Sequence, residues 1–229
     1  MKAIILAAGI GERLRPITDR IPKCLIPIGH KTLLSTQINI LNECGINDVL
    51  VVAGYFANKV IKVYPNVVIN ENYATTNNSH SLAIGLNKVN NGSGLILDGD
   101  IIYEKRVILD LINNKFEINI ATVTAKSVED IGNRVKYDDE GYVLDIGRNI
   151  NLAFPWEIFS GIMKVSGNSF NSFRKEAKKN IYKNEEWTLP ILALSKKTKV
   201  GFQSFNENKY KLININNPDD YEHAKNIFS

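Results

Sequence analysis

The sequence has no long apolar stretch, no basic run and no signal-peptide pattern, and each absence excludes a class of protein. Residues 1–11 and 48–54 are among its longest apolar stretches, far short of the roughly 20 residues that span a bilayer. We therefore expect no membrane insertion. No run of five or six basic residues occurs and the formal charge is only +4, so we expect no nucleic-acid partner. The start of the chain does not resemble a signal peptide, which favours a cytoplasmic protein.

Cysteine and histidine are also scarce. Cys24 and Cys44 form no Cys-x-x-Cys pair, and no pair of histidines lies near them in the sequence. A thiolate metal site or a redox centre is therefore unsupported. Both cysteines are predicted to be free, buried thiols.

The residues that are present suit a globular protein. The chain has 229 residues, of which 44% are hydrophobic and 23% charged, enough to bury a sizeable core. We predict one domain over residues 1–229, with halves at about 1–125 and about 126–229. Apolar, β-branched runs alternate with segments of helical spacing, which predicts an α/β fold with parallel strands and crossover helices. The predicted strands of the first half are 2–8, 48–54, 66–70, 94–98 and 118–125.

The predicted helices of the first half cover residues 33–44 and 79–89, the second under a Ser79 cap. In the second half, residues 134–147 alternate around a turn at 138–141, which is typical of a β-hairpin. Next come a predicted strand at 158–165 and predicted helices at 167–179 and 187–195, and we expect these three elements to form a lid over one sheet edge. The last predicted elements are strands at 200–205 and 211–215 and a helix that begins with Asn217-Pro218.

The first predicted strand leads directly into a glycine-rich loop. Gly9 and Gly11 let backbone N–H groups approach phosphate oxygens closely. The loop falls at the carboxyl edge of the sheet, where ligands of open α/β folds bind. Arg13, Arg15 and Lys23 add three cations within eleven residues. This combination indicates phosphoryl chemistry.

The two best-known phosphate loops do not fit this segment. A Rossmann dinucleotide loop needs a third glycine, but Leu14 stands there and Pro16 soon follows. A P-loop needs Gly-Lys-Ser or Gly-Lys-Thr, which is absent. For an isolated Gly-x-Gly, a tight turn with only a structural role stays open.

The string from Leu6 to Thr18, Leu-Ala-Ala-Gly-x-Gly-x-Arg-Leu-x-Pro-x-Thr, resembles the signature of the sugar-phosphate and choline-phosphate nucleotidyltransferases. The match continues in order at Pro22-Lys23, Gly54-Tyr55, Asp98-Gly99-Asp100 and 215–220. The resemblance implies a Rossmann-like three-layer α/β/α fold with a mostly parallel mixed sheet, that of the nucleotide-diphospho-sugar transferases, carrying a small β-hairpin and helical lid. The first half then binds the nucleotide, and the second half binds the acceptor.

The resemblance also implies an enzyme that moves a nucleotidyl group from a nucleoside triphosphate to a small phosphorylated acceptor, with Mg²⁺ as cofactor and pyrophosphate as leaving group. Arg13 grips the triphosphate, and Lys23 neutralises charge between the α-phosphate and the incoming phosphate; these are the predicted catalytic residues. Asp100 matches the metal ligand, although a polar turn is the structural alternative. The predicted nucleotide-binding residues are Leu6, Ala7, Ala8, Gly9, Gly11, Arg13, Asn78, Ser81 and Asp98.

The second metal position departs from the family pattern. The family usually has an aspartate where this chain has Asn216, our predicted second ligand. An amide oxygen can bind Mg²⁺ but adds no negative charge. Asp219 and Asp220 either compensate or favour the dipole of the helix they begin. A catalytically weakened, nucleotide-binding regulatory module therefore stays open.

The residues Asn77-Asn78-Ser79-His80-Ser81-Leu82 resemble the Asn-Asn-x-x-Ser-Leu segment of choline-phosphate and phosphonate cytidylyltransferases. This resemblance favours CTP. Amides and a hydroxyl supply donors and acceptors for a pyrimidine edge, although the same residues suit a helix cap.

Aromatic and acidic residues occur together twice in the second half, and we predict that Trp156, Glu157 and Trp187 bind the acceptor as a cage for an ammonium group. Burial of both tryptophans in the lid is the alternative. Phosphocholine, an aminoalkylphosphonate and a polyol phosphate are the favoured acceptors. A sugar 1-phosphate used with UTP, dTTP or GTP stays open, as does a homodimer, and no fused acyltransferase domain is expected.

Overall fold

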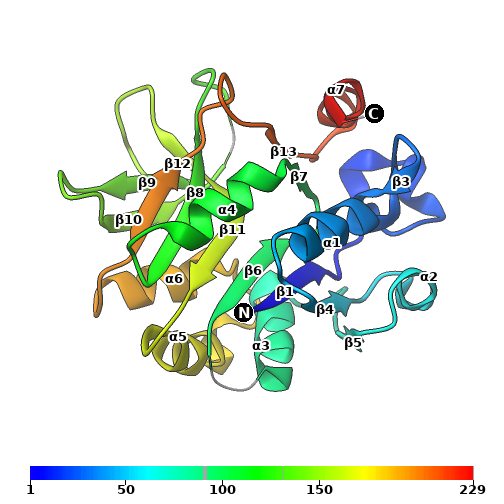
Figure 1. Cartoon of the computed structure of the whole chain (residues 1–229), viewed down its shortest axis with the longest axis horizontal. Coiled ribbons are helices and arrows are strands. Elements are labelled where there is room, and N and C mark those ends of the chain that lie inside the picture. The colour runs from blue at the N-terminus through cyan, green and yellow to red at the C-terminus, as the bar shows by residue number, and fades with distance from the viewer. Residues whose placement is uncertain (90–91, 131, 229) are drawn as a thin grey trace.

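The computed structural model describes residues 1–89, 92–130 and 132–228. A nine-stranded sheet crosses the molecule, and helices cover both of its faces (Figure 1). Its strands are β1 (Lys2–Ala7), β4 (Asp48–Ala53), β5 (Val67–Ile69), β6 (Gly94–Asp98), β8 (Ile118–Thr124), β9 (Arg134–Tyr137), β10 (Val143–Gly147), β11 (Glu157–Val165) and β12 (Gly201–Ser204). Two short pairs accompany it, β2 (Pro27–Ile28) with β3 (Lys31–Thr32) and β7 (Ile101–Tyr103) with β13 (Leu212–Asn214).

Seven α-helices occur in the described ranges. They are α1 (Leu33–Glu43), α2 (Ala57–Val63), α3 (Asn78–Lys88), α4 (Lys105–Asn113), α5 (Ser169–Ala177), α6 (Thr188–Ser195) and α7 (Pro218–Phe228). Within those ranges, none is both long and apolar enough to cross a membrane.

The sheet is parallel except at one central strand and one hairpin. The strand order in its main part is β5-β4-β1-β6-β11-β8-β12. In this part, β11 is antiparallel to both of its neighbours, and the other pairs are parallel. The antiparallel β9–β10 hairpin joins this part at the first residues of β11. Leu6 lies opposite both Val52 and Asp98. The glycine loop after β1 and the acidic turn after β6 therefore meet at one carboxyl edge.

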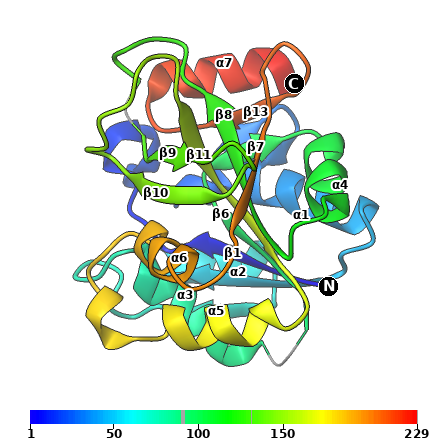
Figure 2. The same cartoon turned by 90° about the vertical axis from the view of Figure 1, so that its left-hand side faces the viewer.

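The first strand has a core on each side. Ala3 and Ile5 of β1 pack in the core that α1 and α4 cover, whereas Ile4 and Leu6 pack in the core that α3, α5 and α6 cover (Figure 2). A strand buried on both faces needs a nearly continuous apolar sequence, which explains why Lys2–Ala7 contains no polar residue after Lys2.

The predicted α/β fold is confirmed, but the strand expected in a lid lies in the centre of the sheet. β11 runs between β6 and β8. Its register shifts between Phe159 and Met163, and Gly161 inside the shift has a φ of +84°, a conformation that favours glycine. Ile162 packs in one core and Val165 in the other. The apolar pattern of a central strand does not distinguish it from a lid strand, and this prediction was wrong.

The two helices expected in the lid also belong to the main body. α5 and α6 pack on the same face of the sheet as α3 (Figure 2), through buried residues that include Phe170, Phe173 and Ile191. The second half therefore completes the three layers instead of closing over them.

The helix of the Asn-rich segment begins earlier than predicted. The N-cap of α3 is Asn77, whose Oδ1 accepts a hydrogen bond from the backbone N–H of Asn78 at 2.8 Å. Ser79 lies inside the helix with its hydroxyl buried, so the predicted Ser79 cap was wrong. Asn77 therefore caps α3 and Asn78 is its first residue, and both line the cavity described below.

The last helix, α7, packs against the first loop of the chain. Tyr221 and Ala224 of α7 form a core cluster with Leu14, Ile26 and other apolar residues near the N-terminus. The Tyr221 hydroxyl also donates a hydrogen bond to the Pro27 carbonyl at 2.8 Å. This packing holds the segment before α7 beside the glycine loop.

A buried carboxylate ties the second-half helices together. Glu176 of α5 is 6% exposed and accepts hydrogen bonds from Lys179 Nζ (2.8 Å), Lys197 Nζ (2.7 Å) and the Tyr182 hydroxyl (2.7 Å). Burial alone raises the pKa of Glu176, but these three donors outweigh burial and lower the pKa to about 2. The ionised carboxylate therefore stabilises this part of the fold.

We expect Glu176→Gln to lower the free energy of unfolding by about 2 kcal/mol at neutral pH. A lowered pKa stabilises the folded state fully above the unfolded-state value of 4.5, and that stabilisation is lost as the pH falls toward 2. Urea unfolding should therefore show the difference between wild type and variant shrinking below about pH 4. Glu222→Gln is the matched control, because Glu222 pairs with Lys225 on the exposed side of α7, where such pairs contribute about 0–1 kcal/mol. Equal losses in both variants would contradict the role of Glu176.

Candidate active site

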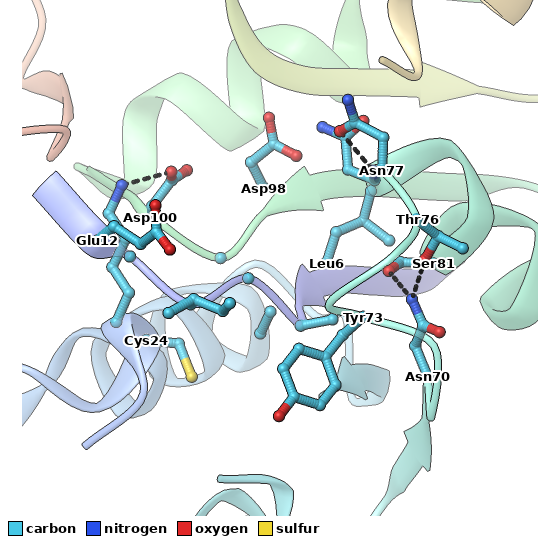
Figure 3. A pocket seen from close by; sticks show the side chains of 18 of the residues that line it. Leu6, Glu12, Cys24, Asn70, Tyr73, Thr76, Asn77, Ser81, Asp98 and Asp100 are labelled. Atoms are coloured by element: carbon cyan, nitrogen blue, oxygen red, sulfur yellow. Dashed lines mark hydrogen bonds and ion pairs between the residues drawn. The ribbon is translucent and has the colours of Figure 1, made fainter. Parts of the chain in front are cut away.

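A cavity of about 650 Å³ opens at the carboxyl edge of β1 and β6. It is lined by the glycine loop, the acidic turn after β6, the Asn-rich segment at the start of α3, and Asn216 before α7 (Figure 3). The lining residues are Leu6, Ala7, Ala8, Gly9, Ile10, Gly11, Glu12, Arg13, Lys23, Cys24, Asn70, Tyr73, Thr76, Asn77, Asn78, Ser81, Asp98, Gly99, Asp100 and Asn216. All the residues predicted to bind the nucleotide or the metal are among them.

The glycine loop is held in a tight conformation. Gly11 has a φ of +74°, and a Cβ there would lie 3.0 Å from the Cβ of Lys23. The Thr18 hydroxyl donates a hydrogen bond to the Gly11 carbonyl at 2.9 Å. Glycine at this position therefore provides both the left-handed turn and the space that brings Lys23 against the loop.

Lys23, Asp100 and Asn216 form a polar cluster at one end of the cavity. Lys23 Nζ lies 2.7 Å from Asp100 Oδ2 and 3.4 Å from Asn216 Oδ1. Arg13 Nη2 donates a second hydrogen bond to Asn216 Oδ1 at 3.0 Å. Two cations and two acceptor oxygens, from segments as far as 203 residues apart in the sequence, thus meet at one point.

The Asp220 carboxylate holds the backbone of Asn216 in place. Its Oδ2 accepts hydrogen bonds from the backbone N–H groups of Asn216 (2.7 Å) and Asn217 (3.1 Å), and the Asp220 N–H donates to Asn217 Oδ1 at 2.9 Å. Asn217 is therefore the N-cap of α7 and Asp220 completes a capping box with it, while Asp219 is exposed. Neither carboxylate lines the cavity.

A buried glutamine holds the acidic turn in place. Gln37 of α1 is fully buried, and its Nε2 donates to the carbonyls of Asp98 (3.0 Å) and Ile101 (2.8 Å). The N–H of Gly99 donates to the Leu6 carbonyl at 2.8 Å, and a Cβ on Gly99 would lie 2.8 Å from that same oxygen. The turn is thereby fixed to β1 and α1.

The two aspartates of the turn face different parts of the cavity (Figure 3). Asp100 faces Lys23, whereas Asp98 Oδ1 accepts a hydrogen bond from the indole Nε1–H of Trp187 at 3.1 Å. Burial raises the pKa of Asp98 well above its usual value, and the nearby charge of Asp100 raises it further.

Amides, hydroxyls and one aromatic ring line the other end of the cavity. Asn70, at the end of β5, is buried and donates through Nδ2 to Ser81 Oγ (3.1 Å) and Thr76 Oγ1 (3.2 Å). Asn78 Oδ1 accepts a hydrogen bond from the backbone N–H of Trp187 at 2.9 Å. Tyr73 lies beside this group (Figure 3). These side chains offer hydrogen-bond donors and acceptors of the kind a nucleobase edge requires.

The predicted ammonium cage is not formed. Trp187 is 1% exposed and packs edge-on against Phe159, with ring centroids 5.0 Å apart. Glu157 is buried on β11, where Thr122, Thr124 and Ser204 donate to its carboxylate. Trp156 is 8% exposed and lies under the Arg134 guanidinium.

None of these three predicted acceptor residues lines the cavity. The physical reason is that Glu157 begins the central strand β11, Trp156 directly precedes it, and Trp187 directly precedes α6, which packs on the sheet. All three side chains are therefore buried.

The sequence prediction also missed several lining residues. Asn70, Tyr73 and Thr76 lie between β5 and α3 and line the cavity. Gln37 does not line the cavity but holds the acidic turn through the Asp98 carbonyl. The spacing Asn-x-x-Tyr-x-x-Thr, which begins at the last residue of the predicted strand 66–70, was an available signal. No sequence signal identified Gln37, because a single polar residue in an amphipathic helix is ordinary.

Fold and cavity together define an α/β protein with a polar cavity that contains cationic side chains, at the carboxyl edge of the sheet where ligands of open α/β folds bind. The chain belongs to the family of the MobA-like NTP transferase domain, which matches residues 3–167. The resemblance to nucleotidyltransferases seen in the sequence is therefore confirmed.

The similar proteins include two cytidylyltransferases. Choline-phosphate cytidylyltransferase of Streptococcus pneumoniae (strain R6) is 36% identical over 154 residues, which cover 64% of this chain and 63% of that protein. CTP:phosphoglutamine cytidylyltransferase of Campylobacter jejuni is 33% identical over 188 residues, 72% of this chain and 73% of that protein. The solved structure of CTP:phosphocholine cytidylyltransferase from S. pneumoniae is 27% identical, with a TM-score of 0.78, and covers 100% of this chain and 99% of its own. The match to the first protein thus spans less than two thirds of its length.

Proposed function

We propose that this chain transfers CMP from CTP to a small phosphorylated or phosphonate acceptor and releases pyrophosphate. The observation that carries the proposal is a single cavity that joins a cationic glycine loop, with Lys23 and Arg13, to the amide-rich segment Asn77-Asn78. The named cytidylyltransferases among the similar proteins, which act on choline phosphate and phosphoglutamine, support the choice of CTP and of a small acceptor.

The proposed reaction is an in-line displacement at the α-phosphorus of CTP. A phosphate or phosphonate oxygen of the acceptor forms the new P–O bond, and the bond to the β-phosphate oxygen breaks, so that pyrophosphate leaves with the electron pair. The acceptor oxygen is already ionised at neutral pH, and no general base is required. Lys23 and Arg13 bind the triphosphate and stabilise the charge of the transition state, so catalysis rests on position and electrostatics.

A divalent cation fits the polar cluster. Asp100 Oδ2 and Asn216 Oδ1 both approach the Lys23 ammonium, so two hard oxygen donors already converge on one cation. Mg²⁺ typically takes one or two protein oxygens and completes its shell with water and phosphate oxygens. We propose that Asp100 and Asn216 hold it, where it would neutralise charge on the triphosphate. Asn216 contributes an uncharged ligand.

Pyrophosphate release tests the proposal directly. Purified protein, with MgCl₂, would be offered CTP, UTP, dTTP or GTP with phosphocholine, 2-aminoethylphosphonate, phosphoglutamine, glycerol phosphate or glucose 1-phosphate. We expect release with CTP and at least one of the first four acceptors, together with the CDP product by mass. Release only with another nucleotide and glucose 1-phosphate would instead support a sugar-1-phosphate nucleotidyltransferase. An inert parent with an active Asn216→Asp variant would support a regulatory module.

A further inference from the structure

The positive charge of the chain is concentrated in one segment. Residues 167–199 contain eight of the 28 basic residues of the chain but only three of its 24 acidic residues. The rest of the chain has slightly more acidic than basic residues, so this segment alone produces the net charge of +4. It contains α5, α6 and the short 3₁₀ helix Asn180–Tyr182 between them.

The acidic residues of this segment offset little of that charge at the surface. Glu176 is buried and is shared by two lysines, and Glu186 is half-buried and pairs with an arginine. Glu185 is the one exposed carboxylate of residues 167–199. The surface of the segment is therefore strongly cationic.

Four polar side chains form the outward side of α5, which lies at the lower border of the molecule in Figure 2. Asn171, Arg174, Lys175 and Lys178 line one surface hollow, because residues three and four apart lie on the same side of a helix. The opposite side of α5 packs in the core. Among the described residues, none of the three cations belongs to an ion pair, so their charges are free to attract an anionic partner.

Two further cations lie beside this hollow. The ammonium groups of Lys179 and Lys197 contact the Glu176 carboxylate at 2.8 and 2.7 Å. These contacts bring the end of α6 against the end of α5. The term basic face is used below for Arg174, Lys175, Lys178, Lys179 and Lys197.

An exposed isoleucine lies beside the basic face. Ile181 is 73% exposed, more than any other large hydrophobic side chain among the described residues. Its neighbour Tyr182 points inward and donates a hydrogen bond to Glu176 at 2.7 Å, so Ile181 is held next to the carboxylate that two lysines share. Single exposed apolar residues are common, but an apolar residue held beside several cations is typical of surfaces that bind anionic lipid.

We propose that the basic face and Ile181 form a docking surface for an anionic lipid bilayer, on which the chain adsorbs without spanning it. The cations attract acidic headgroups, and Ile181 enters the boundary between headgroups and acyl chains. Each contribution is weak, so the binding is reversible. None of these residues lines the candidate active-site cavity. The inference therefore goes beyond the proposed function and does not depend on it.

A nucleic acid fits this surface less well than a bilayer does. Proteins that bind single strands stack the bases on exposed aromatic rings, whereas all the aromatic residues of 167–199 are buried. An exposed isoleucine adds nothing to phosphate contacts. A bilayer uses both the cations and the apolar side chain.

Co-sedimentation of the full chain with vesicles tests the proposal. Vesicles of phosphatidylcholine alone would be compared with vesicles that also contain about 30% phosphatidylglycerol, in about 0.1 M NaCl. We expect binding to the acidic vesicles to be tighter by about 10-fold or more. Most of that binding should be lost in about 0.5 M NaCl, because salt screens the attraction between the cations and the headgroups.

Two sets of variants separate the charges from the apolar side chain. Lys175→Gln together with Lys178→Gln should weaken binding to acidic vesicles roughly 25-fold, since each lysine near the surface contributes about fivefold. Ile181→Ser should weaken it by about 3- to 10-fold. The matched control is Ile61→Ser with Lys62→Gln, an exposed isoleucine and lysine of α2 outside the basic face, which should leave binding unchanged. All five positions are exposed, so the thermal unfolding curves of the variants should match that of the wild type.

Four results would overturn the proposal. They are equal binding, or none, to the two kinds of vesicle; a paired-lysine variant that binds as tightly as the control; an Ile181→Ser variant that binds as tightly as the wild type; and tighter binding to a short single-stranded RNA than to acidic vesicles, which would indicate a nucleic-acid surface. Pyrophosphate release in solution decides the proposed function separately, because vesicle binding requires no turnover.

Discussion

Lys23→Ala is expected to lower the rate of nucleotidyl transfer by about 10³-fold while changing the affinity for CTP much less. Lys23 contacts both oxygens of the polar cluster, Asp100 Oδ2 at 2.7 Å and Asn216 Oδ1 at 3.4 Å. A hydrogen-bond donor that acts mainly on the transition state typically contributes about 10²–10³ in turnover. Single-turnover pyrophosphate release at saturating CTP gives the rate, and calorimetric titration gives the affinity.

The control for this variant is Lys2→Ala. Lys2 forms a lysine–aspartate pair with Asp48 of the same 2.7 Å length, at the opposite end of the sheet. Its removal should leave the rate unchanged. If Lys23→Ala transfers CMP at the wild-type rate, Lys23 has no part in the chemistry. An equal fall in rate and affinity would assign it to nucleotide binding alone.

Asp100→Asn is expected to lower turnover by about 10²-fold and to raise the Mg²⁺ concentration needed for half-maximal activity. The change removes the only carboxylate of the polar cluster within the described residues and leaves two amides, which carry no charge to hold a divalent ion. Turnover measured against MgCl₂ at fixed CTP separates the two effects.

Asp48→Asn provides the matched comparison, since Asp48 is the partner of Lys2 and lies far from the glycine loop. An Asp100→Asn enzyme with wild-type turnover and metal dependence would exclude Asp100 as the metal ligand. A double variant with Asn216→Asp adds a further test, because a carboxylate on the other side of Lys23 should recover part of the loss if both positions hold the same ion.

The elements predicted best from the sequence are those with a strong local pattern. β1 is apolar after Lys2 because it is buried on both faces, and α1 shows its buried stripe through Leu34, Ile38 and Leu41. The hairpin turns where three acidic residues are followed by a glycine. The lid prediction failed because β11 has the same apolar composition in a lid as in a sheet centre. Its true place follows from pairing with β6 and β8, which no local pattern reports.

The acceptor site illustrates the same limit. An aromatic residue beside a carboxylate suggested an ammonium cage at Trp187, yet Trp187 is buried and only its N–H reaches the cavity, through Asp98. Composition specifies what a side chain can bind, but burial determines whether a ligand can reach it.

The sequence by itself determined that β1 leads into a glycine loop with nearby cations, and that an acidic turn follows β6, because residues close together in the chain fix these features. Only the tertiary structure decided what faces them. Asn216 meets Lys23 and Arg13 across about 200 residues because Tyr221 and Ala224 of α7 pack against Leu14 and Ile26. Long-range packing of apolar side chains, which depends on the whole chain, placed those polar groups within hydrogen-bonding distance.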